Sequence, residues 1–231
     1  MTRTLGLLLL AAAALSAACS DSTGTPKGQG RLRFVHVSPD APDLSLVIDG
    51  DTVASNIAYL GSSDYLDLQE GGHVIQVADA SSNTTLIDQD LTVADQTDYT
   101  MLVADTLGHI RTFVLTDDNS SPPAGTARVR AVHAAPGAPV DGVDVYVTEP
   151  DADLTLASPT ASGVKFGQVL PDATVNAGTP YQIRVTPAGS KEVLIDSGPL
   201  TLESFQVRTV IAVDAVGGGE PLNFLVLNDL N

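Results

Sequence analysis

Two histidines have a residue type and setting that could support acid–base chemistry or metal binding. His36 and His133 each stand shortly before a Pro-x-Ala-Pro segment, and histidine is a common general base and metal ligand. A catalytic histidine needs partner groups that recur with it, and no Ser, Cys or Glu recurs beside both of these residues. We therefore expect both imidazoles to be structural, to lie at the rim of a core and to bond the backbone of the following turn.

Cys19 is the single cysteine of the 231-residue chain, so no disulfide can form within it. It follows an apolar run, Leu5 to Leu15, which is too short for a permanent transmembrane helix and is typical of a signal peptide. We predict that residues 1–18 are a signal peptide and that Cys19 receives a lipid after cleavage. An ordinary secretory signal that is cut near Ala18 is the alternative.

The predicted cleavage site resembles the lipobox of bacterial lipoproteins. Its residues are Leu15-Ser16-Ala17-Ala18-Cys19, with serine where a lipobox usually carries leucine. Ser20 stands where lipoproteins kept in the inner membrane commonly carry aspartate. The resemblance implies export and a lipid anchor in the cell envelope, in the outer membrane where the host has one. Residues 19–30 are then the lipidated cysteine and a flexible tether.

The chain has 28 acidic and 11 basic residues and a net charge of −17. Such a surface repels phosphate backbones and anionic lipid headgroups, which excludes nucleic acid as a partner and leaves the lipid as the membrane contact. Acid clusters such as Asp49-Gly50-Asp51 and Glu149-Pro150-Asp151-Ala152-Asp153 could supply oxygen ligands to Ca²⁺, but none has the spacing of an EF-hand. We expect solvated loops, no metal site and no cofactor, with structural calcium as the alternative.

A short segment near the start of the mature chain occurs twice. Residues 31–42 return as residues 128–139, and 7 of the 12 positions are identical. The shared signature comprises Arg33, His36, Pro39 and Pro42 in the first copy and Arg130, His133, Pro136 and Pro139 in the second. Later matches keep their order while the offset grows from 97 to 109, which places an insertion in the second copy, in residues 149–160.

The hydrophobic pattern of each copy has a period of two. Leu44, Leu46 and Ile48 alternate with other residues, as in a half-buried strand, and turn signals such as Asp49-Gly50 recur at the spacing of an all-β sandwich. We predict an all-β protein of two tandem immunoglobulin-like or transthyretin-like antiparallel β-sandwiches, each of about seven or eight strands. The domains are residues 31–116 and 127–231, joined by a linker at residues 117–126.

Four of the eight arginines lie on the predicted first strands of the two copies. They are Arg31, Arg33, Arg128 and Arg130, which alternate along the strand and therefore face away from the core. We expect them to pair with the surrounding aspartates and to protect an edge strand. A binding patch for an acidic polymer is the alternative.

The signature Arg-x-Val-His-x-[Ser/Ala]-Pro-x-Ala-Pro and the strand Val143-Asp144-Val145-Tyr146-Val147 resemble the bacterial surface family called domain of unknown function 4397. The resemblance extends over residues 31 to 231 and implies exported, often tandem β-sandwiches without known catalytic residues. The first copy departs from it, with Ser45-Leu46-Val47-Ile48 where the Asp-Val-Tyr-Val strand is expected.

These features favour a cell-envelope lipoprotein that acts as a non-catalytic surface binding or structural module. The sequence contains no nucleophile elbow, zinc-protease helix, phosphate-binding loop or dinucleotide fingerprint. Its partner is then another surface protein or a glycan, although a chain with no Trp offers few aromatic platforms for sugars. An exported hydrolase and a calcium-stabilised adhesin that uses the loops at the sandwich ends are the alternatives.

Overall fold

The computed structural model describes residues 27–230, and in this part of the chain the regular structure is β-strand apart from one short 3-10 turn, η1 (Leu107–His109). The predicted signal peptide and Cys19 lie outside the described residues. Within residues 27–230, no helix has the length and apolar character that a membrane span requires. The prediction of an all-β protein is confirmed.

The strands fall into two sets of eight. The first set is β1 (Gln29–His36), β2 (Leu44–Ile48), β3 (Asp51–Ile57), β4 (Leu66–Gln69), β5 (Gly71–Asp79), β6 (Thr85–Val93), β7 (Asp98–Ala104) and β8 (Arg111–Asp117). The second set is β9 (Thr126–His133), β10 (Val143–Thr148), β11 (Ala161–Val164), β12 (Val169–Asn176), β13 (Pro180–Pro187), β14 (Ile195–Thr201), β15 (Val207–Val213) and β16 (Asn223–Leu230).

Each set forms one β-sandwich of two four-stranded sheets. The sheets have the strand orders β4-β1-β7-β8 and β3-β2-β5-β6 in the first sandwich, and β12-β9-β15-β16 and β11-β10-β13-β14 in the second. The second sandwich thus repeats the first strand for strand, which confirms the two tandem sandwiches.

The pairing departs from a purely antiparallel pattern at one place in each sandwich. Strand β1 pairs with β7 in parallel, and β9 pairs with β15 in parallel. Between the two strands of each pair the chain crosses to the other sheet and returns in the same direction, and such a crossover is what a parallel pair requires.

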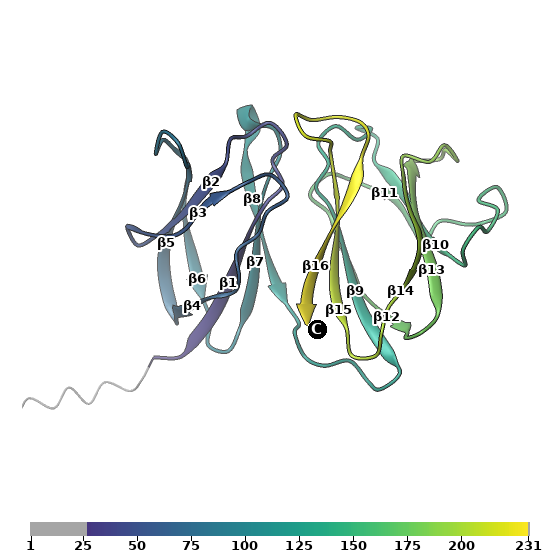
Figure 1. Ribbon diagram of the computed structural model, residues 1–231, viewed down its shortest axis with the longest axis horizontal. Helices are drawn as coiled ribbons and strands as arrows, with labels where there is room; N and C mark the ends of the chain where they lie inside the picture. Colours follow the sequence, from purple (N-terminus) through teal and green to yellow (C-terminus); the bar gives the residue numbers. More distant parts are fainter. Residues whose placement is uncertain (1–26, 231) are drawn as a thin grey trace, which may run out of the picture.

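The two sandwiches lie side by side, and the sheets β4-β1-β7-β8 and β12-β9-β15-β16 face each other (Figure 1). Apolar side chains of both sheets form one buried cluster, which includes Val35 and Leu102 of the first domain and Val132 and Ile211 of the second. The domains are therefore stacked as four β-layers, and the two inner sheets are covered on both faces.

Strand β1 shows how the sequence produces an inner sheet. Leu32 and Phe34 belong to the core of the first sandwich, whereas Val35 belongs to the cluster between the domains. All three side chains are 0% exposed. Successive side chains of a strand point to opposite faces, so a strand that is covered on both sides can bury apolar side chains on each of its faces.

The second sandwich has a long connection between β10 and β11. Residues 149–160 separate these strands, whereas Asp49 and Gly50 alone separate β2 from β3. These two residues have φ values of 53° and 92°, as expected for a two-residue hairpin turn that favours Asp-Gly. The predicted insertion in the second copy is thereby confirmed.

Candidate ligand-binding cavity

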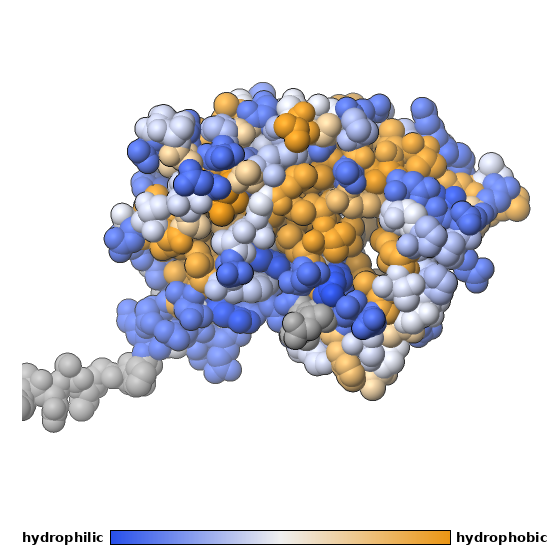
Figure 2. All heavy atoms as spheres, viewed as in Figure 1, coloured by the Kyte–Doolittle hydropathy of each residue, from blue (hydrophilic) through white to orange (hydrophobic). Residues whose placement is uncertain are grey.

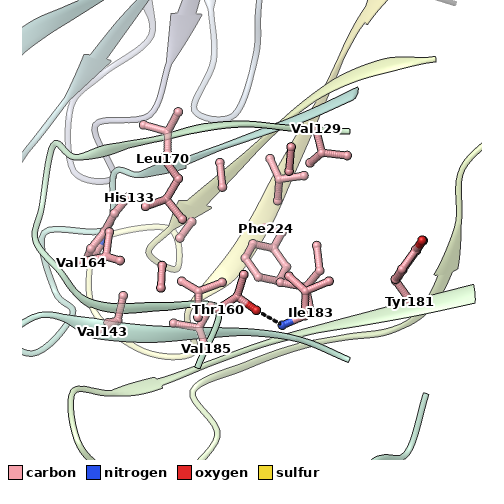
Figure 3. Close-up of a pocket in the computed structure, with 18 of the residues that line it drawn as sticks. Val129, His133, Val143, Thr160, Val164, Leu170, Tyr181, Ile183, Val185 and Phe224 are labelled. Carbon is pink, nitrogen blue, oxygen red and sulfur yellow. Dashed lines mark hydrogen bonds between the residues drawn. The ribbon is translucent and has the colours of Figure 1, made fainter. Parts of the chain in front are cut away.

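The interior of the second sandwich holds an apolar cavity with a volume of about 480 Å³. It lies between the two sheets of this domain, and Val129, Ala131, Val145, Ile183 and Phe224 are part of its wall. Side chains from both sheets point into it (Figure 3). Figure 2 shows hydrophobic side chains gathered around a hollow in this side of the domain. The volume falls within the range of about 300–1,000 Å³ that is usual for small-molecule sites.

The cavity arises because the second copy carries smaller side chains at positions that fill the core of the first. Leu32 and Phe34 of β1 are fully buried in the first sandwich. In the matching strand β9, these positions carry Val129 and Ala131. Both smaller side chains are only half-buried, although they face the interior of their sandwich.

The same reduction in size occurs on neighbouring strands. Met101 of β7 is fully buried, and the matching position of β15 carries Val210. Leu66 of β4 pairs with Leu32 in the first sandwich. In the second sandwich, Ala173 of β12 pairs with the matching Val129. Several missing side-chain groups therefore combine into one continuous space.

One end of the cavity is closed and the other is open. His133 and Tyr181 lie at opposite ends (Figure 3). His133, Val143 and Val164 are 4%, 2% and 4% exposed, so solvent hardly reaches the wall at the histidine end. Tyr181 and Val175 are half-buried. Val147, Thr160, Pro171 and Ala173 also belong to the wall and are exposed, so the cavity opens to solvent away from the histidine end.

His133 places a hydrogen-bond donor at the closed end. Its Nδ1 accepts the N–H of Ala135 over 3.3 Å, so the neutral ring carries its proton on Nε2. Among residues 27–230, no group accepts a hydrogen bond from Nε2. Burial lowers the pKa of His133 to about 4, so Nε2 is an uncharged donor at neutral pH.

The other polar groups of the wall are hydroxyls that bond the backbone. Thr160 Oγ1 accepts the N–H of Val147 over 3.1 Å, and Tyr181 Oη accepts the N–H of Asn176 over 3.2 Å. Within the described part of the chain, no Asp, Glu, Lys or Arg side chain contributes to the wall. The arrangement suits an apolar guest and lacks the paired groups that acid–base or nucleophilic chemistry needs.

Binding of an apolar guest in this cavity would have a favourable free energy. Burial of hydrocarbon against such a wall contributes about 0.8 kcal/mol for each methylene group that leaves water. The open end admits water, but water against an apolar wall is itself unfavourable. Filling the space with hydrocarbon is therefore favourable.

His36 stands at the matching position of the first sandwich and makes one more hydrogen bond than His133 does. It is 0% exposed, its Nε2 bonds the carbonyl oxygen of Pro42 over 3.1 Å, and its Nδ1 accepts the N–H of Ser38 over 3.3 Å. Burial lowers its pKa, and the hydrogen bond to Pro42 partly opposes this effect. Both ring nitrogens are thus bonded to the backbone of the turn.

The signature prolines lie in the loops that follow β1 and β9. Pro39 and Pro42 belong to the first of these loops, and Pro136 and Pro139 to the second. The carbonyl of Pro39 accepts the N–H of Gly217 across the domain boundary over 2.8 Å. The loop that follows β1 therefore contacts the second domain.

Arg33 and Arg130 lie buried between the two domains. The expectation that they protect an edge strand is wrong, because β1 lies between β4 and β7 and β9 lies between β12 and β15. The other sandwich covers each of these sheets, so side chains that point away from their own core enter the interface. Arg33 forms an ion pair with Asp229, and Arg130 forms one with Asp117 over 2.6 Å.

Two threonines join these ion pairs into a closed ring of hydrogen bonds. Thr100 accepts from the first arginine over 2.8 Å and donates to Asp117 over 2.6 Å. Thr209 accepts from the second arginine over 2.9 Å and donates to Asp229 over 2.6 Å. The ring follows the repeat, because each domain contributes one arginine, one threonine and one aspartate.

The outer arginines pair with aspartates, as expected. Arg31 bonds Asp98, and Arg128 bonds Asp118. Within residues 27–230, no group of three or more His, Cys, Asp or Glu residues is placed to hold a metal ion. In the acid cluster Asp49-Gly50-Asp51, Oδ2 of Asp49 is hydrogen-bonded to Nδ1 of His73 over 2.6 Å.

Residues 30–146 match the family described as Domain of unknown function (DUF4397). The chain belongs to this family. The single match covers the strands of the first sandwich and continues as far as Tyr146 in β10 of this DUF4397 protein. No curated protein sequence matches the chain significantly.

Several solved structures resemble this DUF4397 protein distantly. Family 41 α-glucan-binding modules of streptococcal virulence factors share 13% identity at a TM-score of 0.29, over 84% of this chain and 96% of theirs. A family 26 carbohydrate-binding module from Eubacterium rectale, in complex with maltoheptaose, shares 10% identity at a TM-score of 0.25, over 87% of this chain and 98% of its own. TM-scores this low do not indicate a ligand for the present chain.

The alternating pattern of the sequence does not indicate the cavity. Its signal is the loss of volume at matching core positions of the repeat, such as Phe34 and Ala131. Each of these changes is apolar to apolar, so the alternating pattern that predicts the strands is unaffected by it. A comparison of side-chain sizes between the two copies would have revealed it.

Proposed function

We propose that this DUF4397 protein is a non-catalytic binding module of the cell envelope, anchored through Cys19, and that it binds an apolar ligand in the second sandwich. The observation that carries the proposal is the open apolar cavity of about 480 Å³. The first sandwich has the same strand order and a filled core. It packs against the sheet β12-β9-β15-β16 of the binding domain. It acts as a platform for the second.

The chemistry of the cavity wall supports a binding function rather than catalysis. His133 is an ionisable group at the closed end, and neither an acid nor a nucleophilic hydroxyl is bonded to its ring. The matching His36 has both ring nitrogens bonded to backbone groups. Neither histidine has the nucleophile and orienting group that a hydrolase would need.

Fluorescence of the uncharged apolar dye N-phenyl-1-naphthylamine tests the proposed site. The chain from Ser20 onward, which contains the whole described fold, should bind the dye and enhance its emission. Ala131→Phe places in the cavity the residue that the first copy carries at this position, and it should abolish binding while the fold is kept. Val74→Phe adds the same bulk on the surface of the first sandwich, where Val74 is 44% exposed, and should leave binding unchanged. Equal dye binding by wild type and Ala131→Phe would refute the site.

The lipid anchor is a separate part of the proposal. Two or three acyl chains on Cys19 would hold the protein on a membrane durably, because each buried methylene contributes about 0.8 kcal/mol. Cys19→Ser should release the protein from the membrane fraction and leave its unfolding curve unchanged. Mass spectrometry of the wild-type N-terminus checks the modification directly. A mature wild-type chain with an unmodified cysteine, or without this cysteine, would overturn the anchor.

A further inference from the structure

We infer that the cavity of the second sandwich takes a single uncharged aliphatic chain of about 12 to 16 carbons, with an oxygen-bearing end group bonded to His133. The inference rests on the proposed function and adds the chemical class and the orientation of the ligand.

The size of the ligand follows from the volume of the cavity. A water-sized group occupies about 30 Å³, so about 480 Å³ holds about sixteen such groups. The wall is made mainly of short aliphatic side chains, such as Val129, Ala131 and Val145. A flexible hydrocarbon can follow such a wall closely and gain dispersion contacts along its whole length.

The absence of charge on the ligand follows from the composition of the wall. No Lys or Arg among the described residues lines the cavity, so a buried carboxylate or phosphate would have no counter-charge. An unpaired buried charge is strongly unfavourable. The low pKa of His133, about 4, keeps the ring neutral at pH 7, and the net charge of −17 repels anions from the entrance.

The orientation follows from the two ends of the cavity. His133 Nε2 is a neutral donor at the closed end, where Val143 and Val164 exclude solvent. A hydroxyl, ester or carbonyl oxygen of a ligand can accept its proton, and the donor then gains a partner in a dry site. The hydrocarbon tail extends away from His133 toward the exposed part of the wall, where a longer chain can protrude into solvent.

Displacement of the bound dye by straight-chain compounds tests the inference at pH 7. Primary alcohols should bind about fourfold more tightly for each added methylene, up to about 12 to 16 carbons, and then reach a plateau. The matching carboxylates should bind at least about tenfold more weakly than the alcohols, because their charge would be buried. His133→Leu should weaken binding of an alcohol by about two- to tenfold and leave binding of the alkane of equal length unchanged.

A measurement on the wild-type protein makes the test independent of how the variant folds. The ¹⁵N resonance of His133 Nε2 should shift when an alcohol binds and should not shift when an alkane binds. Dye binding that Ala131→Phe blocks, together with no dependence on alcohol chain length or tighter binding of carboxylates, would overturn this inference and leave the proposed site intact. Failure of the wild type to bind the dye at all would overturn the proposed function itself.

Discussion

The first and second sandwiches share one strand order, and their interiors differ. In the first, Phe34 and Met101 are fully buried and the core is closed. In the second, the matching positions carry Ala131 and Val210, and the sheets enclose about 480 Å³ of accessible space. Alternation of apolar residues and backbone pairing therefore determine the topology, whereas side-chain volume determines whether the sandwich is filled or hollow.

The same contrast appears at the two signature histidines. His36 bonds the backbone with both ring nitrogens, whereas His133, which lines the cavity, bonds it with Nδ1 alone among the described residues. The histidine of the filled domain thus uses both ring nitrogens to hold the turn, whereas Nε2 of the histidine in the hollow domain remains available for a ligand.

Emptying the first core should have the largest effect. Phe34→Ala creates in the first sandwich the change that the second already carries, and a change of this kind in a packed core costs about 3–5 kcal/mol. Phe224→Ala is the matched control, because this ring is half-buried in the cavity wall. It should cost clearly less. Unfolding in guanidinium chloride measures both, and equal losses would contradict the difference in packing.

Breaking the ring between the domains should have the next largest effect. Asp229→Asn leaves Arg33 buried without its counter-charge, which costs about 3 kcal/mol by the usual behaviour of buried pairs. Replacing both partners by apolar residues, with Arg33→Met and Asp229→Leu, should recover most of the loss. Asp117→Asn breaks the matching pair with Arg130 and should have a similar effect. Chemical denaturation measures all the variants, and a near-zero effect of both single changes would exclude a stabilising role for the ring.

The interface shows where prediction from the sequence stops. The alternation of Leu32, Arg33 and Phe34 correctly indicates a strand with Arg33 on the face opposite the core. From one strand alone, however, a face covered by another domain cannot be told from a face in solvent. The apolar residues of the outer face, such as Val35 and Leu102, carry the missing information, because a solvent-exposed face would alternate with polar residues. The second domain that covers them is distant in sequence.

Acid should destabilise the protein through His133. Its pKa is about 4 in the fold and rises to its ordinary value of 6.5 on unfolding, so the unfolded chain binds more protons between these values. The free energy of unfolding therefore falls as the pH drops below 6.5, by about 2 kcal/mol at pH 5. His133→Leu should flatten this slope. His36→Leu should flatten it less, because the Pro42 carbonyl offsets part of the burial effect in the first domain. Denaturation curves at pH 7 and pH 5 measure the slopes, and an unchanged slope in His133→Leu would rule out this residue as the cause.

The smallest effect on stability should come from removing or adding one methylene group at matching positions of the two sandwiches. Ile48 is 4% exposed in β2, whereas Val147, its counterpart in β10, is 38% exposed. Ile48→Val should cost about 1 kcal/mol, because it removes a methyl group from a filled core. Val147→Ile returns that group to the hollow sandwich, where it stays partly hydrated, so the gain should be under about 0.5 kcal/mol. Denaturation midpoints measured side by side have the precision needed, provided that the denaturant slope is unchanged. Equal and opposite changes at the two positions would mean that the wall of the second sandwich packs as tightly as the core of the first, and the distinction between the two interiors would then be lost.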